Sequence, residues 1–189
     1  LLVATAGAEI YEVDDAEGMQ LHAGPLQIGH CALECWGAAT NPAVPYEFCT
    51  VGDDKSVRIW HANDDSLVKM CMLDTMARCV CYAPDGSFIA VGLGGDSDGK
   101  KQRKDGGFVI LNTEDLTIIH EARDSKDIIS AIKISPDGTT LALASHDGCI
   151  YVYNVGDFAS KAKCRGHKGG VTGIDFSVDS AFLQSTSSQ

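Results

Sequence analysis

The sequence lacks any apolar run that approaches the roughly 20 residues a helix needs to cross a bilayer, so we expect no membrane span. It also lacks an initiator methionine, and its first residues, LLVATAGAEIYEV, carry neither the basic region nor the long apolar stretch of a signal peptide. We therefore expect the chain to be an internal part of a longer protein. Positive charge is scarce as well, since 15 basic residues stand against 26 acidic ones, for a formal net charge of -11. Because such a field repels polyanions, nucleic-acid binding is disfavoured.

Signatures of catalysis are missing too. The sequence has no nucleophile elbow, no glycine loop that cradles phosphate before a helix, no quartet of metal ligands and no helical 3.6-residue periodicity. An enzyme, such as a thiol hydrolase that uses a Cys and one of the six His residues, is the class of function that these absences disfavour. We predict no catalytic residue, no cofactor and no metal site.

Cysteine, by contrast, is plentiful, with eight residues at positions 31, 35, 49, 71, 79, 81, 149 and 164. Cys31 and Cys35, beside His30, have the spacing of half a zinc site, but a structural zinc needs four ligands and no second paired cluster follows. The alternative is free thiols that pack as small hydrophobic residues in a reducing compartment. The sequence favours the free thiols.

Four turn segments recur at a nearly fixed interval. They are Asn41-Pro42, YAPDG, ISPDG and FSVDS, and their proline positions are 42, 84, 136 and 178, the last occupied by Val. The steps are 42, 52 and 42 residues, and the long step holds the insertion GGDSDGKKQRKDGG, of roughly ten extra residues. Without it the period is near 42, inside the ~40–45 residues of a four-stranded propeller blade. We predict an all-β, incomplete β-propeller of about four blades, each a four-stranded antiparallel sheet.

The repeats divide residues 1–189, taken as one partial propeller, into approximate blades. Residues 1–26 read as the end of a preceding blade, and the next segments are 27–70, 71–120, 121–162 and a truncated 163–189. Five residues before each proline position the residue is small, which lets first strands crowd a narrow axis. One position earlier, at the predicted rim of the central channel, stand Trp36, Arg78, Ser130 and Thr172. On the same rim we expect the basic residues of the insertion, Lys100, Lys101, Arg103 and Lys104.

The first repeat resembles a WD repeat, because Gly29-His30 opens it, Asp54 lies in its tight turn and Ile59-Trp60 ends it. The resemblance implies a WD-repeat propeller. It also implies a buried structural relay that catalyses nothing, made of His30, Thr50, Asp54 and Trp60. The other repeats depart from this pattern. The third keeps Asp147 but ends in Val-Tyr, and the fourth keeps only the Gly-His pair. The relay is therefore expected to be complete in the first blade alone.

Longer strings narrow the resemblance. LECWGAATNP, ARCVCYAPDGSFIAVG and LALASHDGCIYVYNV are similar, in the same order, to blades of the echinoderm microtubule-associated protein-like family. That resemblance implies one half of a tandem propeller in a cytoplasmic, cytoskeletal protein that associates with microtubules and binds tubulin.

Two hypotheses extend this resemblance. The basic insertion is expected to attract an acidic partner such as a tubulin tail. Open blade edges are expected to promote self-association. The alternative function is a generic WD-repeat scaffold for another multiprotein assembly.

Overall fold

The computed structural model describes residues 1–5, 9–23, 27–30, 34–95 and 105–188. Within these ranges the regular secondary structure consists of antiparallel strands, and no α-helix occurs. It follows that this part of the chain holds no helix with the length and apolar character needed to cross a bilayer. The prediction of an all-β fold is confirmed.

The strands form five sheets that follow the chain in order. A small sheet comes first, with β1 (Leu2–Ala4), β2 (Glu9–Glu12) and β3 (Gln27–Ile28). The first four-stranded sheet contains β4 (Cys35–Thr40), β5 (Glu47–Gly52), β6 (Ser56–His61) and β7 (Ser66–Met72). The second contains β8 (Ala77–Tyr82), β9 (Phe88–Leu93), β10 (Gly107–Asn112) and β11 (Ile118–Arg123).

The third four-stranded sheet and a final pair complete the described chain. They contain β12 (Ile129–Ile134), β13 (Thr140–Ser145), β14 (Cys149–Asn154) and β15 (Ser160–Arg165), followed by β16 (Val171–Phe176) and β17 (Leu183–Ser187). The sheets that begin at β4, β8, β12 and β16 are called blades 1 to 4. Blade 4 has two strands among the described residues.

The recurring turns join the first and second strands of each blade, and their residues explain the tight reversal. In blade 2, Asp85 Oδ1 accepts hydrogen bonds from the backbone N of Ser87 at 3.0 Å and from its hydroxyl at 2.7 Å. Gly86 between them has a φ of +74°, a conformation that costs glycine little. The Asp137-Gly138 turn of blade 3 repeats this arrangement, with a glycine φ of +72°. The period found in the sequence is therefore the period of these turns.

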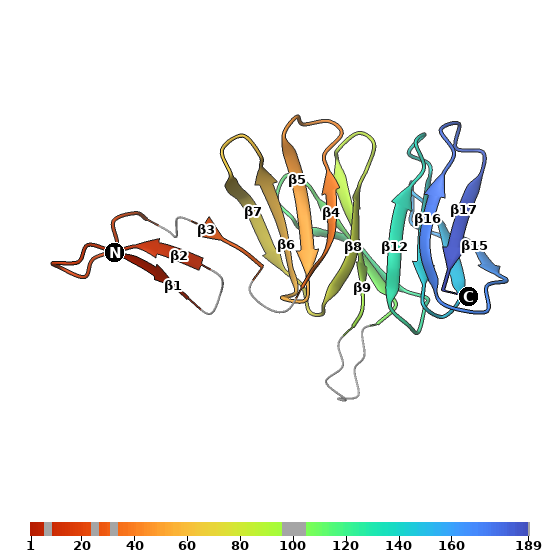
Figure 1. Ribbon diagram of the computed structural model, residues 1–189. Coiled ribbons are helices and arrows are strands. Elements are labelled where there is room, and N and C mark those ends of the chain that lie inside the picture. The colour runs from red at the N-terminus through yellow and green to blue at the C-terminus, as the bar shows by residue number, and fades with distance from the viewer. Residues whose placement is uncertain (6–8, 24–26, 31–33, 96–104, 189) are drawn as a thin grey trace.

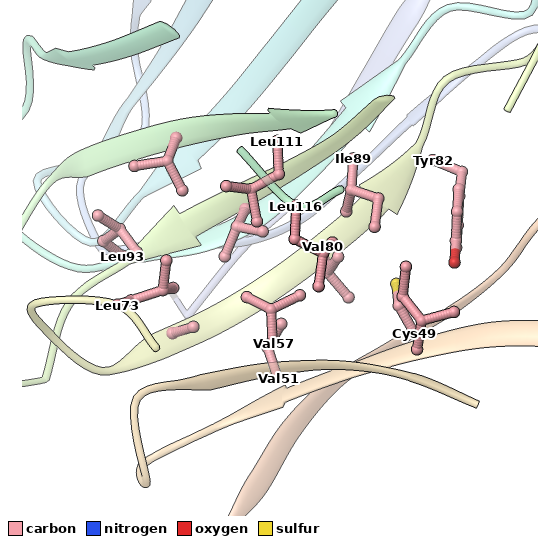
Figure 2. Close-up of a cluster of buried hydrophobic side chains, with 14 residues drawn as sticks. Cys49, Val51, Val57, Leu73, Val80, Tyr82, Ile89, Leu93, Leu111 and Leu116 are labelled. Atoms are coloured by element: carbon pink, nitrogen blue, oxygen red, sulfur yellow. The ribbon is translucent and has the colours of Figure 1, made fainter. Parts of the chain in front are cut away.

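Hydrophobic side chains fill the spaces between neighbouring blades. Figure 2 shows the cluster between blades 1 and 2, where Val51 and Val57 meet Val80, Ile89 and Leu111. Two further clusters join blade 2 to blade 3 and blade 3 to blade 4. Both faces of an inner blade are thus covered, which is why its strands carry apolar residues on both sides.

The first strands approach one another closely, and small residues permit this. A Cβ at Gly37 would lie 2.8 Å from Val51 Cγ2 and 3.1 Å from the Cα of Cys79 in the next blade. The blades stand side by side as an open row (Figure 1). A cavity of about 550 Å³ lies along the first strands, lined from β4, β8 and β12. This open arrangement confirms the prediction of an incomplete propeller.

Candidate functional site

The first polar cluster of blade 1 contains the four residues that the WD resemblance selects. Trp60 Nε1 donates a hydrogen bond to Thr50 Oγ1 at 2.7 Å. The same hydroxyl lies 2.8 Å from Nε2 of His30, whose Nδ1 lies 2.9 Å from Asp54 Oδ1. Because an indole N–H only donates and a carboxylate only accepts, a neutral His30 with its proton on Nδ1 satisfies every group. The structure therefore brings all four side chains into one continuous chain of hydrogen bonds.

Two further residues extend this relay. Ser56 Oγ donates to Asp54 Oδ1 at 2.8 Å, and Arg58 donates from Nε to Ser56 Oγ at 3.0 Å and from Nη2 to Asp54 Oδ2 at 3.1 Å. Burial raises the pKa of the Asp54 carboxyl, but the hydrogen bonds from His30 and Ser56 outweigh it, so the net pKa is lowered. The sequence carried a signal for both residues, since Ser56, Arg58 and Trp60 alternate along β6 and point to one face, and Asp54 lies in the turn just before this strand.

The other blades contain parts of the relay. In blade 4, His167 Nε2 lies 2.7 Å from Ser185 Oγ, which matches the His30–Thr50 contact. In blade 3, Ser125 Oγ donates to Asp147 Oδ2 at 3.2 Å in place of a histidine. Tyr153 pairs across the sheet as Trp60 does, but its hydroxyl donates to Asp124 at 2.6 Å. Among the described residues the His, Thr, Asp and Trp set occurs together in blade 1.

A second cluster lies where the first strands begin, and we call Trp36, Arg78 and Asp53 the rim stack. The Arg78 guanidinium carbon lies 4.5 Å from the centre of the Trp36 ring. Arg78 also forms an ion pair with Asp53 at 2.6 Å and donates from Nε to the carbonyl of Gly94 at 3.0 Å. The stack therefore joins the β5–β6 turn of blade 1 to β8 of blade 2, while Trp36 stays 52% exposed.

The described ends of the insertion attach beside this stack. Gly95 N donates to Asp105 Oδ1 at 2.8 Å, and Arg123 Nε donates to the carbonyl of Asp105 at 2.8 Å. Gly95 has a φ of +102°, a conformation that favours glycine, and a Cβ there would collide with the Arg78 guanidinium. The predicted rim residues Lys100, Lys101, Arg103 and Lys104 lie outside the described residues.

The remaining rim residues make other contacts. Ser130 donates to the carbonyl of Val171 at 2.5 Å, which joins blade 3 to blade 4. Thr172 is exposed, and its hydroxyl lies 3.3 Å from that of Thr186. Of the four first-strand positions, the structure thus brings Trp36 and Arg78 into direct contact. Asp53 was missed in the sequence because it lies in a turn 25 residues before Arg78, and only the fold places the two together.

The described cysteines are free thiols. Burial raises the pKa of Cys49 and of Cys81 to about 12, while Cys35 and Cys164 are exposed. Cys31 lies outside the described residues. In the rest of the chain that the structure describes, no group of three or more His, Cys, Asp or Glu side chains is arranged to hold a metal ion.

Comparison with known proteins shows to which family this chain belongs. The sequence profile described as the echinoderm microtubule-associated protein second beta-propeller matches residues 35–189. The chain belongs to the echinoderm microtubule-associated protein family. The matched region begins at β4 and includes blades 1 to 4 together with both polar clusters.

Individual members of the echinoderm microtubule-associated protein family are similar over most of this chain. Human echinoderm microtubule-associated protein-like 3 is 31% identical over 191 residues, which include 99% of this chain and 20% of the relative. Rat echinoderm microtubule-associated protein-like 1 is 34% identical over 167 residues, which include 86% of this chain and 19% of the relative. Human echinoderm microtubule-associated protein-like 2 is 35% identical over 154 residues, which include 78% of this chain and 22% of the relative. The chain thus spans about a fifth of the length of these relatives.

Proposed function

We propose that this chain is part of a non-catalytic scaffold that binds tubulin or microtubules, and that the partner docks on the rim stack. Its relatives are named as microtubule-associated proteins, which supports the partner and a cytoplasmic location at the cytoskeleton. The observation that carries the proposed location is the exposed Trp36 ring held against Arg78. The relay has a structural role in this proposal, because its polar groups form hydrogen bonds with one another and stabilise blade 1.

The rim stack has the properties of a binding hot spot. Tryptophan and arginine are the side chains most enriched at such spots, and a truncated hot-spot residue costs about 2 kcal/mol or more in binding. Arg78 is already fixed by Asp53 and by the Gly94 carbonyl, so little side-chain freedom remains to be lost when a partner docks. The proposal extends this surface to Lys100, Lys101, Arg103 and Lys104, because both described ends of the insertion attach beside Arg78.

Co-sedimentation of the full-length protein with microtubules tests the proposal. Trp36→Ala should weaken binding about 30-fold, the equivalent of a 2 kcal/mol loss. Tyr46→Ala is the control, since Tyr46 is an exposed aromatic residue in the β4–β5 turn, at the other end of blade 1. Replacement of the four insertion cations by Ser should weaken binding mainly at low salt.

The outcomes distinguish a wrong partner from a wrong docking surface. A wild-type protein that does not co-sediment would leave the generic scaffold as the better account. A wild-type protein that binds, together with a Trp36→Ala variant that binds equally well, would show that the rim stack is the wrong surface.

We also propose that the chain self-associates through the open edge of blade 1. β7 is the last strand of its sheet, and it exposes Val68, Met70 and Met72 by 47%, 48% and 63%. An exposed apolar edge strand pairs readily with another chain. Light scattering should therefore give a mass above that of the monomer, and Met70→Lys should lower it. A monomer mass for the wild-type chain at high concentration would refute this proposal.

A further inference from the structure

The outer strand of blade 3 lies in a basic segment of an otherwise acidic chain. Residues 158–174 contain no Asp or Glu, while four of the 15 basic residues fall between positions 161 and 168. β15 runs through this segment and is exposed along its whole length. It lies at the outer margin of the molecule (Figure 1). Against a net charge of -11, this segment is a local reversal of sign.

β15 is also an open sheet edge. It is the last strand in the order β12-β13-β14-β15 and pairs with β14 alone. Apart from that pairing, its backbone from Lys161 to Arg165 makes no hydrogen bond to another described backbone group. Every other N–H and C=O of such a strand points outward, so this edge can accept one more strand.

The equivalent strand of blade 1 does not share this basic character. The outer strands β7 and β15 have the same bulge and the same pairing with the third strand of their blades, so their positions correspond one to one. At three matched positions blade 1 carries Val68, Met70 and Met72, whereas blade 3 carries Lys161, Lys163 and Arg165. Equivalent edges of one repeated fold thus differ completely in chemistry.

The cations of this edge differ in how they are held. Lys163 Nζ donates to the hydroxyl of Tyr151, lies 4.2 Å from the centre of its ring and lies 3.9 Å from Asp147 Oδ2. These contacts fix Lys163 across the sheet. Lys161 and Arg165, in contrast, form no ion pair or side-chain hydrogen bond with any residue that the structure describes. Two unneutralised charges therefore flank a fixed one along a single strand.

We propose that the β15 edge binds an extended acidic peptide segment, which adds to blade 3 as a fifth strand. Its backbone would pair with the outward groups of β15, and carboxylates at alternate positions would lie opposite the cations. A nucleic acid has no peptide backbone to continue the sheet, and the overall charge repels it. Lysine on an edge also opposes pairing with a neutral or basic strand, so the same residues select an acidic one.

This proposal concerns a surface separate from the rim stack and does not depend on tubulin binding. The probe is a labelled decapeptide of alternating Glu and Thr, measured with the intact chain by fluorescence anisotropy at low salt. A second decapeptide with the same five Glu residues but Pro in place of Thr keeps the charge and disfavours the ladder, because proline fixes φ at about −65° and biases the residue before it towards polyproline II. The Glu-Thr peptide should bind at least tenfold more tightly than the Glu-Pro peptide.

Matched variants locate the site. Lys161→Ser with Arg165→Ser should weaken Glu-Thr binding about tenfold or more. Lys126→Ser with Lys133→Ser removes the same charge from exposed positions off this edge and should change binding less than twofold. All four residues are exposed, so the folded state should be kept, and circular dichroism checks this.

Three results would overturn the proposal. The first is equal binding of the Glu-Pro peptide, which would mean attraction by charge without strand addition. The second is equal weakening by both double variants. The third is no peptide binding together with dimer formation by the Lys161→Ser, Arg165→Ser variant, which would mean that the cations only keep this edge from pairing.

Discussion

The relay of blade 1 makes a prediction about stability that a single substitution can test. Thr50→Val keeps the size and β-branching of the side chain but removes the hydroxyl that accepts from Trp60 and contacts His30. The indole N–H then has no acceptor within the relay. A buried donor left unpaired costs about 1–3 kcal/mol. Because Thr50 and Trp60 are half-buried and water can reach them in part, we expect about 1–2 kcal/mol.

Urea denaturation followed by fluorescence and circular dichroism measures this loss. With a slope of about 2 kcal/mol per molar urea, the midpoint should fall by about 0.5–1 M while the slope stays unchanged. Thr40→Val is the matched control, because Thr40 lies exposed in the same sheet and its hydroxyl forms no hydrogen bond with a described residue. The control should lie within about 0.5 kcal/mol of the wild type.

A double-mutant cycle separates the hydrogen bond from the shape of the site. In a Trp60→Phe background there is no indole N–H to leave unpaired, so Thr50→Val should cost about 1 kcal/mol less than in the wild type. A Thr50→Val variant as stable as Thr40→Val, or a cycle with no coupling, would refute the reasoning that the relay stabilises the blade.

Three further predictions concern pH, thiols and packing. The native pKa of Asp54 lies below its ordinary 3.8, so its stabilising effect is present above about pH 4 and is lost as pH falls through the lower native pKa; urea titrations of wild type and Asp54→Asn between pH 5 and 2.5 should converge, and parallel curves would contradict this. Under native conditions a thiol reagent should modify Cys35 and Cys164 first, because both are exposed, although partial burial raises the pKa of the Cys35 thiol as well. It should modify Cys49, Cys79 and Cys81 only after unfolding, because these three are buried and burial raises the pKa of each. Mass spectrometry of the labelled peptides measures this, and equal labelling of the exposed and the buried cysteines in the native protein would contradict the hydrophobic core described above. Gly37→Val should destabilise by about 1–3 kcal/mol, since its side chain meets Val51 and the Cys79 backbone, whereas Gly166→Val, in open space, should have little effect on the melting temperature.

Features of the fold that depend on local turn residues could be predicted from the sequence, whereas features that depend on tertiary contacts could not. The blade period depends on local turn chemistry, and residues such as Asp85 and Gly86 express it directly. The turns before β11 and β15 use the same aspartate contact, since Asp115 and Asp157 each accept from the backbone N two residues later. Leu116 and Phe158 stand where the other turns have glycine, so the repeat pattern did not separate the fourth strands β7, β11 and β15 from the next repeat. Their edges are exposed, so their composition is free to differ, as Met70 and Lys163 show.

The two polar clusters differ in the same respect, because the relay follows from local sequence and the rim stack follows from tertiary packing. The relay residues are carried by a repeat motif, and Ser56 and Arg58 follow from alternation along β6. The rim stack depends on three separate segments that meet only when blade 2 packs against blade 1. Neither spacing nor residue type indicated that Asp53 and Gly94 fix Arg78, because those contacts are products of the tertiary arrangement.

Amide hydrogen exchange of the full-length protein, with and without microtubules, tests the proposed docking surface most directly. If the partner docks on the rim stack, exchange should slow in the peptides that contain residues 35–40 and 77–82, and stay unchanged in the peptide that contains residues 41–46 at the opposite turn. Trp36→Ala should abolish this protection. Protection confined to other segments, or protection at the rim that survives Trp36→Ala, would contradict the account.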